Sequence, residues 1–208
     1  MTSDNGSQRP AWLKSHGPKW QASEPERVHD NPWFAVDRYE AIAPTGAPAT
    51  YYLHDQKAWA TGIVPLHEDG TVTLVGQWRF PFGTYSWELP EGGAPKREHP
   101  LDGAKRELAE EANLRASDWR KILVMHLSNS VTNEVAYCYL ATGLSPRHDH
   151  APDDTENLAV TRVPFRELLD AIAAGHITDS ITVAAVLRVH HMAVNGELDP
   201  SLAQLVLG

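Results

Sequence analysis

The stretch GGAPKREHPLDGAKRELAEEANL, residues 92 to 114, concentrates carboxylates on a segment whose pattern is typical of a helix. Glu107, Glu110 and Glu111 lie one, three and four residues apart, so on a helix their side chains share one small volume. Converging anions repel one another unless a counterion lies between them. Carboxylate oxygens suit a hard cation such as Mg²⁺, with Mn²⁺ as an alternative. The stretch therefore predicts a divalent-cation site.

The residues around this cluster predict how the helix is anchored. Residues 87–93 form a short apolar run broken by a proline and a glycine pair, which predicts a strand that ends in a tight loop. Pro100 fits the first helical turn, and Asp102 complements the helix dipole there. Apolar residues recur at helical spacing at Leu101, Ala104, Leu108 and Ala112. An acidic helix face alone is usually solvated surface, and this anchoring argues for a built site instead.

The same stretch matches the Nudix box, whose pattern is Gly, five residues, Glu, seven residues, then Arg-Glu-apolar-any-Glu-Glu-any-Gly-apolar. The matching residues are Gly92, Glu98, Arg106, Glu107, Leu108, Glu110, Glu111 and Leu114. The last glycine is replaced by Asn113, and Asn is the commonest substitute for Gly in the left-handed conformation that follows a helix. The chain thus resembles the Nudix hydrolases, which implies an α/β/α sandwich with a mixed sheet.

The resemblance implies hydrolysis of a pyrophosphate linkage by water, assisted by Mg²⁺ ions that activate the water and screen developing charge. Glu107 and Glu111 are expected to be direct metal ligands. Glu110 is expected to bind the metal or to lie next to its ligands. The family also implies a main-chain carbonyl ligand, which is that of Glu91 in this chain.

The remaining box residues have supporting roles in the resemblance. Arg106 and Glu110 belong to the expected catalytic set, and Gly92 and Glu98 to the structural part of the box. We expect Arg106 and Glu98 to hold the loop and the helix together through a paired charge.

Residues 75–81, VGQWRFP, and 87–90, WELP, resemble the ADP-ribose pyrophosphatase branch, which hydrolyses nucleoside diphosphate sugars. This resemblance places Gln77, Arg79 and Glu88 at the substrate. Arg79 is predicted to bind the diphosphate, because a guanidinium can hold phosphate oxygens bidentately. The alternative is a strand arginine paired with a nearby carboxylate. Trp33 offers an aromatic face for a base, with core or dimer packing as the alternative.

Residues 128–134, SNSVTNE, lie where this branch has a mobile loop that ends in a functional Glu. Glu134 is the leading candidate for general base, with an exposed strand-end Glu as the alternative. Glu156 is a second candidate. Asn129 and Ser130 stand where members selective for ADP-ribose carry Pro-Gly, so this loop leaves the substrate open.

ADP-ribose is the leading substrate, and GDP-mannose, NADH or a diadenosine polyphosphate are alternatives. A further alternative is a Nudix-like sensor that binds such a nucleotide without cleaving it. The box carboxylates are all present, which favours hydrolysis over sensing.

The composition of the chain is that of an ordinary globular protein of 208 residues, large enough for one core with an extension. Its net charge of -9 argues against nucleic-acid and membrane partners, which attract clustered Lys and Arg. Cys138 is the only cysteine, so no intrachain disulfide can form, and we expect it to fill space in a strand. The chain lacks a secretory pattern, so we expect a cytoplasmic protein.

Three regions are expected along the chain: a flexible, irregular arm over 1–32, N-terminal strands over 33–56, and a Nudix domain over 57–208. By resemblance, the N-terminal strands pair two subunits into a homodimer. Strands are predicted at 33–42, 50–54, 58–66, 71–80, 119–127, 134–142 and 158–163. A hairpin turn at 67–70 is expected to join the third and fourth of these. Helices are predicted from Pro164 and over 181–194, the latter as the last element.

Overall fold

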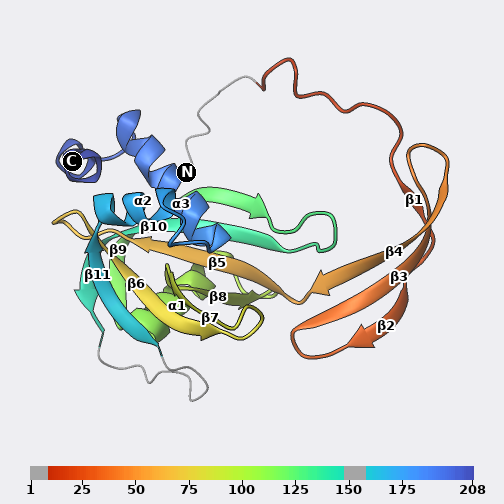
Figure 1. The fold of residues 1–208 in the computed structure, drawn as a ribbon, viewed down its shortest axis with the longest axis horizontal. Helices are drawn as coiled ribbons and strands as arrows, with labels where there is room; N and C mark the ends of the chain where they lie inside the picture. Colours follow the sequence, from red (N-terminus) through yellow and green to blue (C-terminus); the bar gives the residue numbers. More distant parts are fainter. Residues whose placement is uncertain (1–8, 148–157) are drawn as a thin grey trace.

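The structure is a computed structural model that describes residues 9–147 and 158–208 (Figure 1). Glu156 lies outside these residues. The strands are β1 (Gln21–Ala22), β2 (Glu26–Asp30), β3 (Phe34–Ile42), β4 (Pro48–Gln56), β5 (Ala58–Pro65), β6 (Thr71–Arg79), β7 (Thr84–Glu88), β8 (Glu91–Pro95), β9 (Leu114–His126), β10 (Val135–Pro146) and β11 (Ala159–Pro164). The helices are α1 (Pro100–Ala112), α2 (Phe165–Ala173), α3 (Ser180–Val194) and α4 (Pro200–Leu207).

The central sheet has the order β8-β5-β10-β9 and is mixed, because β5 and β10 run parallel while the other pairs are antiparallel. A second sheet has the order β11-β6-β7. The third is N-terminal: β3 pairs with β1, β2 and β4, and in Figure 1 this sheet extends away from the rest of the molecule. The predicted N-terminal β extension is thereby confirmed.

Helices α1 and α3 cover opposite faces of the central sheet. Side chains alternate between the two faces of a strand, so adjacent residues of β5 point to opposite faces of the sheet. Ile63 packs with Leu108 of α1, whereas the adjacent Val64 packs in the cluster that contains Val186 of α3. Cys138 is fully buried on the α3 side, and burial raises the pKa of its thiol to about 12. The predicted α/β/α sandwich and the buried cysteine are confirmed.

Strands β1 and β2 fall within residues 1–32, where the sequence analysis expected an irregular arm. All residues of β2 are exposed, so it lacks the apolar alternation by which strands are predicted. Main-chain pairing with β3 stabilises it instead, together with an ion pair of 2.8 Å between Arg27 Nε and Asp37 Oδ1. The expected irregular arm is therefore wrong for these strands.

Strands β5 and β6 do not form the expected hairpin. The turn between them is as predicted, and Gly70 adopts a φ of +78° that a side chain would disfavour. Beyond one bridge between Leu66 and Val72, however, β5 joins the central sheet and β6 joins the second sheet. Strand β5 pairs with β8 and β10, and β6 pairs with β7 and β11.

The C-terminal end contains a helix that the sequence analysis missed. Helix α4 begins after Asp199, whose carboxylate accepts a hydrogen bond from the Ser201 backbone N–H at 2.9 Å, and Pro200 occupies its first turn. Both are standard helix-start signals, so α4 was predictable. Among the described residues, no helix has the length and apolar character of a membrane span.

Candidate active site

The box helix begins and ends as the sequence predicts, but the segment before it differs. Pro100 lies in the first turn of α1, and Asn113 ends the helix with a φ of 52° and a ψ of 37°, the left-handed conformation. The glycine pair is not in a tight loop. Gly92 and Gly93 lie inside β8, where they pair with Thr61 and Ala60 of β5, because this edge of the central sheet offers main-chain partners.

Strand β8 holds the acidic face of α1 at two points. A Cβ on Gly92 would lie 2.2 Å from the carboxyl carbon of Glu107, so only glycine leaves room for this carboxylate. One residue earlier, the Glu91 backbone N–H donates a hydrogen bond of 2.9 Å to Glu111 Oε2. Glu107 and Glu111, the predicted metal ligands, therefore both contact the strand that carries the predicted carbonyl ligand.

Gly92→Ala is expected to reduce kcat/KM by about tenfold to a hundredfold, because a carboxylate displaced by about 1 Å costs that much at a reacting centre. The added methyl group meets the movable end of a side chain, so we expect the fold to persist and the melting temperature to change little. Gly93→Ala is the matched control, since its Cβ would meet only Ala58 Cβ at 3.5 Å. Equal activities of the two variants would contradict this account of Gly92.

Arg106 links the box helix to β8. One guanidinium nitrogen contacts Glu107 at 2.8 Å and Glu110 at 2.9 Å. The other donates to the Gly93 carbonyl oxygen at 2.8 Å and lies 3.5 Å from Glu98. The structure thus contains the charge pair expected between Arg106 and Glu98. Arg106 neutralises neighbouring carboxylates and fixes their direction.

A second group of carboxylates comes from β7, β8 and the N-cap of α3. Oxygens of Glu88, Glu91 and Asp179 all lie within 4.8 Å of one another. Burial, and the proximity of the other two carboxylates, raise the pKa of Glu91 well above its ordinary value. Glu91 Oε2 is buried and has no hydrogen-bond partner. An orphaned carboxylate oxygen among other carboxylates fits the ligand preference of a divalent cation.

Asp179 was missed by the sequence analysis. It is the N-cap of α3, and its Oδ2 accepts a hydrogen bond from the Thr182 backbone N–H at 2.7 Å. The helix-start pattern Asp-Ser-Ile-Thr reveals the cap, but nothing local reveals that the cap faces Glu91. That proximity comes from the packing of α3 on the sheet.

Arg79 lies between these carboxylates and solvent. Its Nε donates to both oxygens of the buried Glu88, at 3.0 and 2.9 Å, and one terminal nitrogen lies 2.7 Å from Glu91 Oε1. The carboxylate pairing that the sequence analysis kept as an alternative is therefore present. The Arg79 side chain is 35% exposed to solvent. The diphosphate contact of Arg79 stays a prediction.

One cleft of about 580 Å³, a volume in the range of small-molecule ligand pockets, is lined by five of the predicted site residues. The box carboxylates Glu107, Glu110 and Glu111 are not among its lining residues. Its lining includes Trp33, Lys57, Arg79, Glu91, Gly92, Glu134 and Asp179. A second, adjoining hollow is lined by Arg79, Glu88, Glu91 and Asp179. Gln77 is partly buried on β6 and is not among the residues that line either hollow.

Glu134 and Trp33 also line the cleft, Glu134 at the end of the loop before β10 and Trp33 in the bend before β3. Burial raises the pKa of Glu134. Its backbone N–H donates to Thr132 Oγ1 at 3.1 Å, which fixes the end of the loop. Trp33 is 73% exposed and therefore has a free aromatic face at the cleft.

Comparisons with known proteins show which family the chain belongs to. The NUDIX domain family matches residues 56–184. An ADP-ribose pyrophosphatase of Mycobacterium tuberculosis is 31% identical over 79% of this chain and 80% of its own length. An ADP-sugar pyrophosphatase of Mus musculus is 26% identical over 81% of this chain and 84% of its own length. The solved structure titled "Crystal structure of ADP compounds hydrolase" covers 89% of this chain and 100% of that chain, with a TM-score of 0.77 at 20% identity, which shows a shared fold. The chain belongs to the Nudix family, and it is a pyrophosphohydrolase of that family.

Proposed function

We propose that the protein hydrolyses the pyrophosphate linkage of a nucleoside diphosphate sugar in the presence of Mg²⁺, with ADP-ribose as the leading substrate. The products are a nucleoside monophosphate and a sugar phosphate. The observation that carries the proposal is the single cleft that joins Arg79, the box strand at Glu91 and Gly92, Glu134 and Trp33. The relatives named for ADP-ribose and ADP-sugar hydrolysis support this substrate class.

The residues of the chain divide the work as follows. Glu107, Glu111 and the main-chain carbonyl of Glu91 would hold the metal, with Glu110 beside them and the Glu88, Glu91 and Asp179 carboxylates close by. Bound Mg²⁺ supplies charge neutralisation at the phosphates and lowers the pKa of water. Arg79 orients the diphosphate, and Trp33 packs against the nucleobase of the substrate.

Glu134 acts as the general base. It accepts a proton from water as the water oxygen bonds to phosphorus, and the bond from that phosphorus to the bridging oxygen breaks. The bridging oxygen leaves with the other phosphate. A carboxyl whose pKa is raised by burial holds a proton more readily than an exposed one, which suits this role.

A direct assay of candidate substrates tests this proposal. Purified protein with Mg²⁺ is incubated with ADP-ribose, other nucleoside diphosphate sugars including GDP-mannose, NADH and diadenosine polyphosphates, and products are identified by mass. We expect ADP-ribose to be cleaved to AMP and ribose 5-phosphate with the highest kcat/KM. Preferential cleavage of NADH or a diadenosine polyphosphate would overturn the substrate class. Binding without cleavage would favour the sensor.

We also propose that the protein forms a homodimer through its N-terminal sheet. That sheet exposes apolar side chains, among them Val28, Ile42 and Tyr52, which a partner subunit would cover. Light scattering that gives the mass of one 23.0 kDa chain at micromolar concentration would contradict this.

A further inference from the structure

The loop that carries Glu134 is attached to the N-terminal sheet. The backbone N–H of His54 on β4 donates to the Val131 carbonyl oxygen at 2.8 Å, and the Tyr51 hydroxyl donates to the Ser130 carbonyl oxygen. A bridge between His54 and Thr132 continues this pairing. The loop that the family resemblance suggests is mobile is thus paired with β4 along most of its length.

Asn133, the residue before Glu134, bonds to β4 through both polar groups of its side-chain amide. Its Oδ1 accepts a hydrogen bond of 2.9 Å from the Gln56 backbone N–H. Its Nδ2 donates a hydrogen bond of 2.6 Å to Asp55 Oδ1. An amide side chain meets both requirements, since it has one acceptor and one donor group in fixed geometry.

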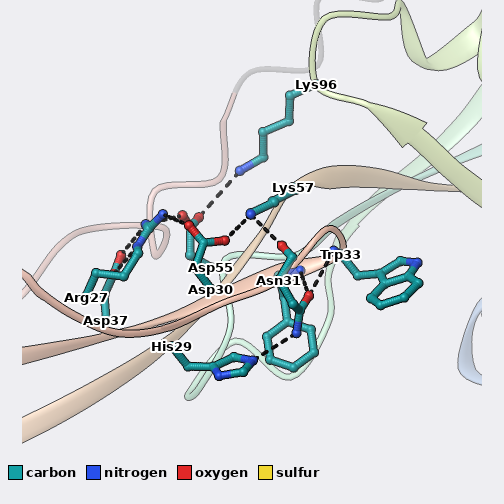
Figure 2. Close-up of polar contacts among 10 residues, drawn as sticks. Arg27, His29, Asp30, Asn31, Trp33, Asp37, Asp55, Lys57 and Lys96 are labelled. Carbon is teal, nitrogen blue, oxygen red and sulfur yellow. Dashed lines mark hydrogen bonds and ion pairs between the residues drawn. The ribbon is translucent and has the colours of Figure 1, made fainter.

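Asp55 is itself held in place by cations. Its Oδ2 lies 3.1 Å from an Arg27 nitrogen, and its Oδ1 lies 3.6 Å from Lys96 Nζ. Figure 2 shows these contacts, with Arg27 also bound to Asp37 of β3. The carboxylate that receives the Asn133 hydrogen bond therefore has a fixed position on β4.

Lys57, directly after β4, holds the segment that carries Trp33, another residue of the cleft lining. Lys57 pairs with Asp30 and donates to the Asn31 carbonyl oxygen, while Asn31 Oδ1 accepts from the Trp33 backbone N–H at 2.9 Å. In Figure 2 the Trp33 ring points away from these contacts. Asp55 and Lys57 thus secure, from positions two residues apart, the segments that carry Glu134 and Trp33.

We propose that Asn133, held by Asp55, is a positioning residue that sets Glu134 in the cleft, and that the N-terminal sheet is in this way part of the catalytic apparatus. The inference rests on the proposed role of Glu134 as general base. If the loop were released from β4, the Glu134 carboxylate would occupy its position in the cleft for a smaller fraction of the time. Loss of position at a base lowers kcat more than it raises KM, because substrate binding by Arg79 and Trp33 does not depend on it.

The test is an exchange of the two side chains. Asn133→Asp keeps the acceptor for the Gln56 N–H but replaces the donor with a carboxylate facing Asp55. We expect kcat to fall by about tenfold to a hundredfold, with KM and the Mg²⁺-induced rise in melting temperature nearly unchanged. The double variant D55N/N133D reverses donor and acceptor, and we expect it to recover kcat to within a few-fold of wild type.

Hydrogen exchange of the backbone amides of residues 128–134 is measured on the same proteins. We expect faster exchange in Asn133→Asp and recovery in D55N/N133D. Faster exchange with unchanged kcat, or a loss of kcat that the double variant fails to recover, would overturn the positioning role. A wild-type protein that cleaves no pyrophosphate substrate would instead refute the proposed function. In that case, slow amide exchange of residues 128–134 in the wild type would still show that β4 holds the loop, and fast exchange would show that it does not.

Discussion

Glu111→Gln is expected to lower kcat for hydrolysis of the nucleoside diphosphate sugar by about a thousandfold, the equivalent of several kcal/mol of transition-state stabilisation supplied through the metal. The amide oxygen can still accept the hydrogen bond that Glu111 receives from the Glu91 backbone N–H, so the fold should be retained. The lost charge weakens the metal site. Steady-state kinetics at saturating Mg²⁺ measure the effect.

The Mg²⁺-induced rise in melting temperature provides a readout that does not depend on activity. A cation that binds only the folded state stabilises it in proportion to the logarithm of its concentration above Kd. We expect this rise in the wild type and a reduced rise in Glu111→Gln. The control is Glu68→Gln, which should keep the full rise because the Glu68 side chain is exposed in the turn before β6. Retained Mg²⁺-dependent turnover in Glu111→Gln would refute the metal role of this residue.

Glu134→Gln has a comparably large expected effect, a fall in kcat of about a hundredfold to ten-thousandfold, the usual contribution of a general base. The substitution leaves the loop contacts of Asn133 in place, so KM and the Mg²⁺ response should change little. Pre-steady-state measurement of the chemical step separates this loss from slow product release.

The pH dependence of the activity tests the same assignment independently. Glu134 can accept a proton only when ionised, and its pKa is raised by burial. Activity of the wild type should therefore fall as the pH drops through a pKa above the ordinary Glu value, and Glu134→Gln should lose the part of the acid limb due to this group. An unchanged acid limb together with wild-type kcat would assign the base to another residue.

Local rules account for what the sequence predicted well. Pro100 at the start of α1, Asn113 in the left-handed conformation at its end, and the apolar stripe between them depend on contacts within a few residues. The box helix was therefore predictable to its boundaries. The acidic face followed from the same helical spacing, since residues three and four apart lie together on a helix.

The contacts that complete the site depend on residues far apart in the chain. Asp179 approaches Glu91 because α3 packs across the face of the sheet, and no spacing pattern encodes that distance. Strand β2 carries no apolar alternation because both of its faces are exposed. The loop before Glu134 is paired with β4, and this pairing becomes visible only when the two segments are placed side by side.

Gly92 was predicted correctly as a required glycine, but its place in the fold was predicted wrongly. The glycine pair predicts a turn, because glycine is the usual residue where the chain bends sharply. In the structure Gly92 lies in an ordinary strand, and the missing side chain serves the close approach of Glu107. The glycine is required by the neighbouring helix, which is a tertiary constraint.

The central claim, that this cleft hydrolyses a pyrophosphate with a metal bound to the box carboxylates, is tested most directly by product analysis of ADP-ribose. Wild-type protein and Glu111→Gln are each incubated with ADP-ribose, with Mg²⁺ or with EDTA, and AMP and ribose 5-phosphate are quantified by mass. We predict equal amounts of the two products from the wild type with Mg²⁺, and a negligible amount with EDTA or from Glu111→Gln. Intact ADP-ribose in every sample, while ADP-ribose still raises the melting temperature of the wild type, would contradict the claim and identify a binding protein.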